Sequence, residues 1–255
     1  MSQPPHEETF MSHLVELRIR LVRALWAIAI IAAPLFLVRN ELYEFLALPM
    51  LKSLPQGTNM IATGVVTSFF IPIKVALMVA FIASLPFVLY QAWAFVAPGL
   101  YAHERRIALP LILGSTLLFI LGMAFCYFFV FQTVFKTIAA WAPKSVTLAP
   151  DIENYISFVM TMFLAFGCTF EVPIVVVVLA MLGVVDTAKL KEIRPYVIVG
   201  AFVIAAVVTP PDVISQLLLA IPMCLLYEVG IFCTRFVKPR TDDQEATAND
   251  PASPT

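Results

Sequence analysis

Charged residues are scarce in this chain. Asp, Glu, Lys and Arg make up 13% of its 255 residues, about half of their share in an average soluble domain. Apolar residues make up 61%, and the mean hydropathy is +0.92. This balance excludes an ordinary soluble domain and predicts an all-α polytopic membrane protein. The net charge of −1 says little, because the distribution of Lys and Arg over the loops is what orients such a chain.

Motifs for common enzymatic chemistries are also missing. The sequence has no GxxxxGK[ST] phosphate loop, no GxSxG nucleophile turn and no HExxH metal motif. Its histidines lack metal-ligand spacing, and its cysteines lie in apolar runs without a CxxC pair: Cys126, Cys168, Cys224 and Cys233. We therefore expect no enzyme, no cofactor, no metal and no nucleic-acid partner.

What the chain does have is six apolar segments, each judged against the roughly 20 helical residues that cross a bilayer. We expect six transmembrane helices at about 21–38, 69–97, 108–135, 154–182, 195–209 and 213–236, which together form the domain 21–236. Residues 1–20 are predicted to hold an amphipathic helix lying on the membrane surface, because apolar residues recur there at helical spacing. Residues 237–255 are predicted to be a disordered tail.

Lys and Arg are unevenly divided between the two sides that this layout defines. One side carries Arg18, Arg20, Arg23, Arg105, Arg106, Lys189, Lys191, Arg194, Arg235, Lys238 and Arg240. The other carries only Arg39, Lys52, Lys136 and Lys144. By the positive-inside rule, both termini are predicted to be cytoplasmic.

Prolines and one short span shape the predicted bundle. Prolines lie in or beside the spans at Pro34, Pro72, Pro86, Pro98, Pro110, Pro173, Pro195 and Pro222. Because proline removes a backbone donor and kinks helices, we expect a cupped bundle. The segment 195–209 would cover only about 22 Å as a helix. Such a short span must thin the bilayer or adjoin a partner or a water-filled cavity.

Two acidic residues stand next to predicted membrane boundaries, Glu16 before the first span and Glu104 before the third. Each has two interpretations. Glu16 can form an i,i+4 ion pair with Arg20, and Glu104 can sit favourably near the positive end of a helix dipole. Alternatively, either carboxylate can accept a bidentate pair from an incoming guanidinium.

Other polar residues fall inside or beside the spans. An ionised Glu171 would cost about 2.5–3.5 kcal/mol in mid-span, so we expect it to face the interior, with Tyr127 or Thr161 as its partner, and to have a functional or polar-cavity role. Lys74 is expected to reach out to the outer interface. Asp212 can cap the last helix, and Glu228 can face the same cavity as Glu171.

Several blocks, in order over about residues 10–236, resemble the TatC family, the multispanning subunit of the twin-arginine protein translocase. They are His13-Leu14-Val15-Glu16-Leu17-Arg18, the run from Phe95 to Arg106, Ser157-Phe158 with Phe170-Glu171-Val172-Pro173, Arg194-Pro195-Tyr196, and Thr209-Pro210-Pro211-Asp212. The resemblance implies a six-helix cupped receptor in the cell inner membrane. It would bind twin-arginine signal peptides of folded precursors, recruit the single-span subunits TatA and TatB, form homo-oligomers, and use the proton motive force.

The resemblance also assigns roles to residues. It implies that Glu16 and Glu104 recognise the arginine pair, with Arg18, Phe95 and Leu100 on matched positions near them. Pro49, in the first outer loop, and Asp212 match positions linked to function. Ile19 departs from the pattern, since other members can carry a basic residue there.

Two other functions suit the residues. A proton-coupled small-solute secondary transporter would fit the prolines, the intramembrane acid and a cavity. Its usual inverted repeat is missing, because the similar stretches 68–86 and 157–173 run in the same direction. A scaffold that only assembles other subunits is the third interpretation, and signal-peptide binding by the purified chain separates it from a receptor.

Overall fold

The computed structural model describes residues 5–52, 60–64, 66–96, 105–141, 149–209 and 212–235. Within these ranges the chain is helical apart from short connections and one isolated β-bridge between Ile61 and Asp151. The elements are α1 (Pro5–Leu35), η1 (Phe36–Val38), α2 (Arg39–Leu51), α3 (Thr67–Val96), α5 (Arg105–Phe125), η2 (Cys126–Val130), α6 (Phe131–Trp141), α7 (Ile152–Met181), α8 (Thr187–Glu192), α9 (Arg194–Val208) and α10 (Val213–Thr234).

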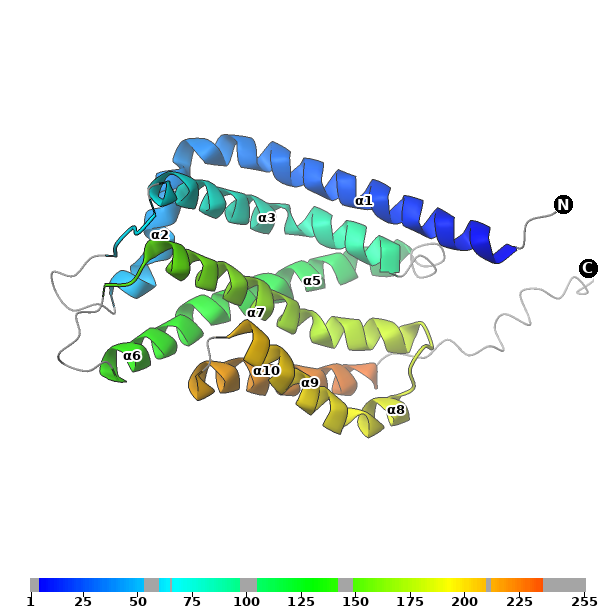
Figure 1. Ribbon diagram of the computed structural model, residues 1–255. Coiled ribbons are helices and arrows are strands. Elements are labelled where there is room, and N and C mark those ends of the chain that lie inside the picture. Colours follow the sequence, from blue (N-terminus) through cyan, green and yellow to red (C-terminus); the bar gives the residue numbers. More distant parts are fainter. Residues whose placement is uncertain are drawn as a thin grey trace, which may run out of the picture.

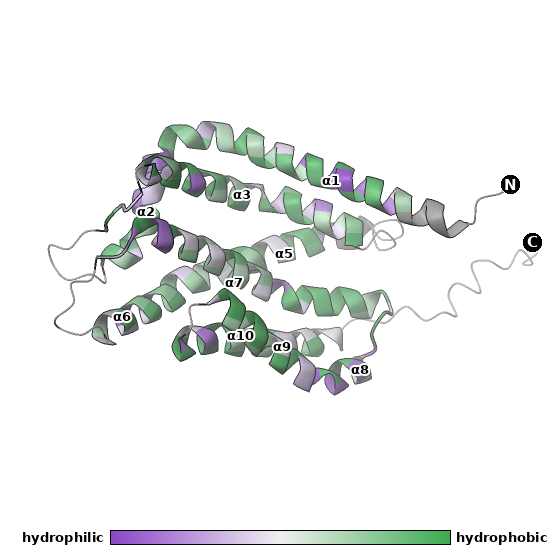
Figure 2. Cartoon of the chain, in the orientation of Figure 1, coloured by the Kyte–Doolittle hydropathy of each residue, from purple (hydrophilic) through white to green (hydrophobic). Residues whose placement is uncertain are grey.

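Five helical stretches of the described chain are long and apolar enough to cross a membrane. They are Met11–Leu51, Thr67–Val96, Leu109–Ile138, Ile152–Met181 and Val213–Thr234. Figure 2 shows apolar residues along these helices and hydrophilic residues mainly near their ends. The all-α polytopic fold is thereby confirmed. The helix α9, which covers most of the short segment 195–209, has only 15 residues; a sixth crossing and the cytoplasmic side of the termini stay predictions.

The helices are arranged so that α1 packs along α3, and α7 packs against both α5 and α10 (Figure 1). The start of α1 and the end of α10 lie at one end of the bundle, which we call the terminal end. The last turn of α3, the first turn of α5 and the helix α8 lie at the same end. The starts of α3 and α7 lie at the opposite end, called the far end. Two of the basic segments that the sequence places on one side, at the start of α5 and in and after α8, therefore lie at the terminal end.

The first helix differs from its prediction. Instead of a separate surface helix up to residue 20 and a span after it, α1 is one helix from Pro5 to Leu35. The reason is local, because no glycine or proline interrupts residues 6–33. Pro34 lies one residue before the end of α1, where the 3-10 turn η1 begins. The predicted boundary at residue 20 is not a helix boundary.

The first outer connection was expected to be a loop, but residues Arg39–Leu51 form α2. Leu46, Ala47 and Pro49 of this helix are buried. The Tyr155 hydroxyl donates to the Leu46 carbonyl at 2.7 Å, which ties α2 to α7. Burial of an apolar face and this long-range hydrogen bond stabilise a helix that its local sequence does not predict.

The third predicted span contains an irregularity. α5, η2 and α6 follow one another without a break, but the five residues of η2 are π-helical. The amide of Phe131 donates to the Cys126 carbonyl, which is the wider bonding step of a π-turn. Prolines continue inside helices at Pro72, Pro86, Pro110, Pro173 and Pro222, and Pro195 stands in the first turn of α9. Pro98 lies outside the described residues.

The core is centred on α7 and its neighbours. Phe131, Val159 and Phe166 have no exposed surface. Two glycines let α5 and α7 approach closely, because a Cβ at Gly122 would lie 2.6 Å from the Phe166 carbonyl oxygen and a Cβ at Gly167 would overlap the Phe119 ring. Small residues at such contacts are the usual means of close helix packing in membranes.

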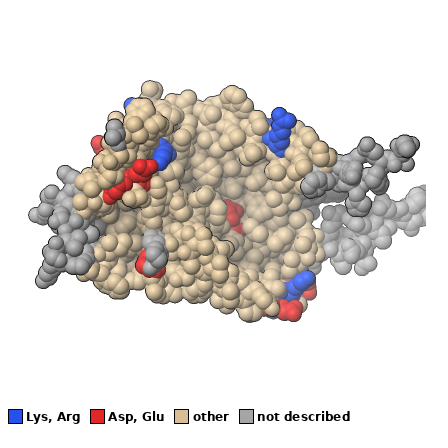
Figure 3. Space-filling view, in the orientation of Figure 1, with Lys and Arg blue, Asp and Glu red and all other residues tan. Residues whose placement is uncertain are grey.

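A hollow of about 400 Å³ opens between α3, α5 and α7. It is almost entirely apolar, and its lining includes Leu77, Phe81, Phe119, Met123, Met160 and Thr161. Figure 3 shows a recess of this kind in the middle of one face, with a single acidic spot in it and the other charged side chains toward the two ends. The predicted cupped shape agrees with this hollow.

Candidate functional site

The predicted binding residue Glu16 lies in a polar cluster between α1 and α3 at the terminal end. The Arg20 Nε donates to Glu16 Oε1 at 2.9 Å, so the i,i+4 ion pair foreseen for Glu16 is present. Arg20 Nη1 also reaches the Gln91 Oε1 on α3 at 3.4 Å. The Glu16 side chain is 39% exposed and that of Arg20 is 21% exposed. Glu16 is therefore an accessible carboxylate that already binds one guanidinium.

Phe95, another predicted site residue, belongs to the same cluster. Its ring stacks on the His13 ring with 4.3 Å between centroids and 21° between planes. His13 stands three residues before Glu16, so both lie on one face of α1. We call His13, Glu16, Arg20, Gln91 and Phe95 the rim patch. No local pattern predicts the contributions of His13 and Gln91, because only packing brings residues about 70 to 80 positions apart together.

The structure says less about the other residues predicted to bind at the rim. Arg18 is exposed on α1. Glu104 and Leu100 lie outside the described residues, so the pairing of Glu104 with Glu16 stays a prediction. The described part of the rim patch alone supplies one carboxylate, one guanidinium, an amide and two rings.

Glu171 lies buried in α7, with 9% of its surface exposed. Neither carboxyl oxygen has a hydrogen-bond partner among the described residues. The expected partners are wrong, because the Tyr127 hydroxyl donates to the Phe45 carbonyl and the Thr161 hydroxyl to the Ser157 carbonyl. The neighbouring polar group is instead the Ser115 hydroxyl on α5. An unsatisfied buried carboxyl is costly, which marks this position for a role beyond packing.

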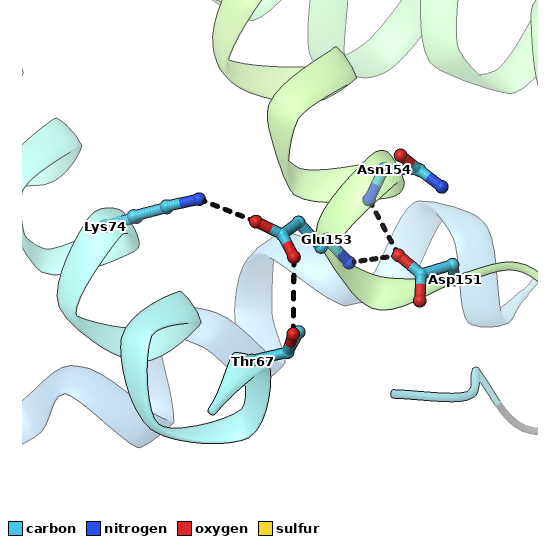
Figure 4. A network of polar contacts seen from close by, with 5 residues as sticks. All are labelled: Thr67, Lys74, Asp151, Glu153 and Asn154. Atoms are coloured by element: carbon cyan, nitrogen blue, oxygen red, sulfur yellow. Dashed lines mark hydrogen bonds and ion pairs between the residues drawn. The ribbon is translucent and has the colours of Figure 1, made fainter. Parts of the chain in front are cut away.

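The far end holds a second polar network, shown in Figure 4. Asp151 caps α7, because its Oδ1 accepts from the amides of Glu153 and Asn154 at 2.9 and 3.0 Å. Its Oδ2 accepts from the Thr63 hydroxyl at 2.6 Å and from the Thr63 amide at 3.2 Å. These hydrogen bonds, that from the Thr63 hydroxyl above all, hold the pKa of Asp151 below its ordinary value.

Glu153 extends this network to α3. Its carboxylate accepts from Lys74 Nζ at 3.1 Å and from the Thr67 hydroxyl at 3.2 Å. Lys74 thus turns toward the far end, where it pairs with an acid 79 residues away in the chain. We call Thr63, Thr67, Lys74, Asp151 and Glu153 the far-end network.

Three further sequence candidates lie away from the rim patch. Asp212 caps α10 by accepting from the Ser215 amide at 2.7 Å, as expected. Glu228 does not turn to the Glu171 region but pairs with Arg194 at 2.6 Å. Pro49 is buried in α2. None of these forms part of the rim patch.

Comparisons with known proteins agree with this architecture. A family model described as "Sec-independent protein translocase protein (TatC)" matches residues 12–222. The TatC protein of Haemophilus influenzae is 46% identical over 255 residues, which cover all of both chains. The TatC protein of Escherichia coli K12 is 49% identical over 229 residues, which cover 90% of this chain and 89% of that one.

Solved structures show the same likeness. A crystal structure described as the twin-arginine translocase receptor TatC superposes with a TM-score of 0.77 at 42% identity, covering 88% of this chain and 98% of that chain. A second, of the same receptor in the detergent DDM, gives a TM-score of 0.78 at 42% identity, with 87% of this chain and 99% of that chain covered.

Proposed function

The chain belongs to the TatC family of Sec-independent protein translocase proteins, and from this premise we propose how its sites work. Membership makes it a receptor or core subunit of the twin-arginine translocase, a multi-pass membrane protein that acts in a complex with other Tat subunits. The secondary-transporter alternative finds no support in these relatives.

The rim patch is the proposed docking place for the arginine pair of a signal peptide. The observation that carries the proposal is the Glu16–Arg20 pair, in which an accessible carboxylate already accepts a guanidinium. A signal arginine would take the same acceptor, either beside Arg20 or in its place. Guanidinium is planar and can bind a carboxylate through two parallel bonds, whereas lysine offers only a point charge. Glu104 is the proposed second acceptor.

The apolar portion of the signal peptide is proposed to enter the hollow between α3, α5 and α7, toward Glu171. Three methionines line this hollow, Met78, Met123 and Met160. Methionine side chains are flexible and polarizable, so such a surface can accommodate many apolar sequences. This adaptability suits a receptor whose cargoes share an arginine pair rather than one apolar sequence.

The helix α9 is the proposed docking edge for the single-span subunits TatA and TatB. Its exposed apolar residues Tyr196, Val199, Val203 and Val207 are between 58% and 81% exposed and recur at helical spacing. A partner helix packed on this row would also compensate for the shortness of α9. We further propose that the chain recruits these subunits, forms homo-oligomers and uses the proton motive force. Its place would be the inner membrane, with both termini in the cytoplasm.

Photo-crosslinking tests the arginine-pair assignment. A twin-arginine peptide with a photoreactive residue beside the pair is added to membranes that contain only this subunit. We expect crosslinks around Glu16 that weaken markedly in Glu16→Ala and Glu104→Ala and with a peptide carrying two lysines. Glu228→Ala is the matched control, since Glu228 also pairs with an arginine at the terminal end. Unchanged crosslinks in Glu104→Ala would refute the assignment of Glu104.

A cysteine crosslinking scan along residues 195–209 tests the second assignment. We expect crosslinks to TatA or TatB at the exposed positions of α9, repeating every three to four residues. A scan that finds only lipid contact along this helix would rule out α9 as the docking edge.

A further inference from the structure

The last described turn of α3 contacts different helices on its two faces. Gln91 and Phe95 meet Arg20 and His13 of α1 in the rim patch. Trp93, which lies between them in sequence, points away from α1, because residues two apart on a helix face nearly opposite directions. It forms a small buried cluster with Val178 of α7, against which Ile174 of the same helix also packs. We call residues 91–95 the coupling turn.

Trp93 also makes a hydrogen bond to a neighbouring helix. Its indole Nε1 donates to the Ser115 hydroxyl oxygen on α5 at 2.8 Å, and both residues are buried. Hydroxyls in transmembrane helices often donate back to the carbonyl four residues earlier. Thr116, the next residue of α5, does so to Ile112 at 2.8 Å. Ser115 has no such bond among the described residues and is turned instead toward α3 and α7.

The neighbour of Ser115 on α7 is Glu171. The register of the two helices places them together, because Gly114 lies opposite Ile174 and Gly167 opposite Phe119. An indole N–H can only donate, so Trp93 occupies a lone pair of the Ser115 oxygen and leaves its proton available. The oxygens of Glu171 are buried and have no hydrogen-bond donor among the described residues. The Ser115 hydroxyl, whose proton is free to be donated, thus lies beside a carboxyl that no other described group satisfies.

We propose that Trp93 and Ser115 are positioning residues for Glu171, and that the coupling turn transmits occupancy of the rim patch to this carboxyl. A peptide arginine that displaces Arg20 from Glu16 also disturbs the contact of Arg20 with Gln91. The coupling turn then shifts, Trp93 shifts with it, and the Ser115 hydroxyl changes its orientation toward Glu171. The proposal rests on the proposed function of the rim patch for its trigger, but the positioning of Glu171 is independent of it.

A hydrophobic carbodiimide, which modifies protonated carboxyl groups in apolar surroundings, reports on Glu171 directly. We expect the rate of Glu171 modification in the full-length protein in membranes to rise about tenfold in Ser115→Ala, because removing the neighbouring hydroxyl donor favours the protonated carboxyl that the carbodiimide modifies. Ser115→Thr should restore the rate. Thr116→Ala is the matched control, since it removes the adjacent hydroxyl of the same helix, and should leave the rate unchanged.

The peptide dependence tests the coupling. Adding a twin-arginine peptide should alter the modification rate in the wild type and have no effect in Trp93→Phe, which keeps a buried ring but loses the N–H donor. In transport assays Ser115→Ala and Glu171→Ala should be strongly non-additive, because the serine acts through the carboxyl.

Two results would overturn the proposal. One is an unchanged basal modification rate in Ser115→Ala, or in Trp93→Phe if Ser115→Ala does not accumulate. The other is a peptide that crosslinks to the rim patch without altering Glu171 reactivity, which would leave the proposed function intact. If the peptide fails to crosslink at all, the proposed function fails and the coupling with it, while the basal rates still decide the positioning role.

Discussion

The two ends of the bundle are tied together in different ways. At the terminal end, the ion pair of the rim patch lies within α1, and the contacts of the patch with α3 include a hydrogen bond of 3.4 Å and a ring stack. At the far end, Asp151 and Glu153 connect three segments through hydrogen bonds of 2.6 to 3.2 Å, three of which come from backbone amides. One end is suited to exchange partners, and the other to hold helices in register.

The carboxylates at the two ends differ in the same way. A carboxylate bonded to flexible side chains can give them up to a competing ligand at little cost, because exposed ion pairs contribute only about 0.2–1 kcal/mol. A carboxylate that accepts from backbone amides cannot, because its loss leaves the helix terminus uncapped. The comparison therefore separates recognition at the terminal end from stability at the far end.

The largest expected effect is on peptide binding. Glu16→Ala should weaken the binding of a twin-arginine peptide roughly tenfold or more, since hydrogen bonds between charged groups contribute about 1.5–3 kcal/mol. The melting temperature should barely change, because an exposed i,i+4 pair contributes only about 0.3–0.5 kcal/mol. Fluorescence titration in nanodiscs and a thermal melt of the same sample check both. A large drop in melting temperature with intact binding would reverse the comparison.

The next effect concerns stability. Asp151→Ala should lower the melting temperature by several degrees and leave peptide binding unchanged, because it removes both the cap of α7 and the tie to Thr63. Asp186→Ala is the matched control, since Asp186 caps α8 through the Thr187 amide alone. Thermal unfolding of the detergent-solubilised protein compares the two. Equal losses in both variants would mean that the tie to Thr63 contributes nothing.

The pH dependence of the far end follows from the same residue. The pKa of Asp151 is lower in the folded protein than its ordinary value near 3.8. Its contribution is therefore fully present above that value and is lost as the pH falls toward the lower folded pKa. Melting temperatures measured from about pH 6 to about pH 3 should fall less steeply in Asp151→Asn than in the wild type. Identical slopes would show that Asp151 does not govern this dependence.

The smallest effect is expected at Lys74 and Glu153. Both side chains are nearly half exposed, so Glu153→Gln should cost at most about 1 kcal/mol, and less at high salt. The exchanged pair Lys74→Glu with Glu153→Lys should recover most of the loss, as a double-mutant cycle of melting temperatures can show. Failure of the exchanged pair to recover would assign the effect to the Thr67 contact instead.

Local patterns in the sequence predict a large part of this structure. The apolar spans, the short α9, the cap at Asp212 and the Glu16–Arg20 pair all depend on residues within one or two helical turns. The ordered blocks that resemble TatC added what no single residue could, namely the joint assignment of Glu16 and Glu104.

What the sequence could not predict depends on distant contacts. The helix α2 forms because its apolar face is buried, and the partners of Lys74 and Asp151 lie 79 and 88 residues away. The hydrogen bond between Trp93 and Ser115 joins two spans whose packing no periodicity specifies. Tyr127 and Thr161 were assigned to Glu171 because they are polar, whereas their hydroxyls are taken by backbone carbonyls.

The glycine contacts have a mechanical consequence. Gly122 fixes α5 against α7, and Gly230 fixes α10 against the same helix, where an added Cβ would lie 3.0 Å from Pro173 Cα. Because these neighbours are backbone atoms, which cannot turn aside as a side chain can, a larger residue at either glycine would push α5 or α10 away from α7. α1, whose most apolar stretch is only 6% buried, packs mainly along α3. Among the described spans, α1 is therefore the one that other helices hold least, so it is the helix that a ligand bound at the rim patch would displace most easily.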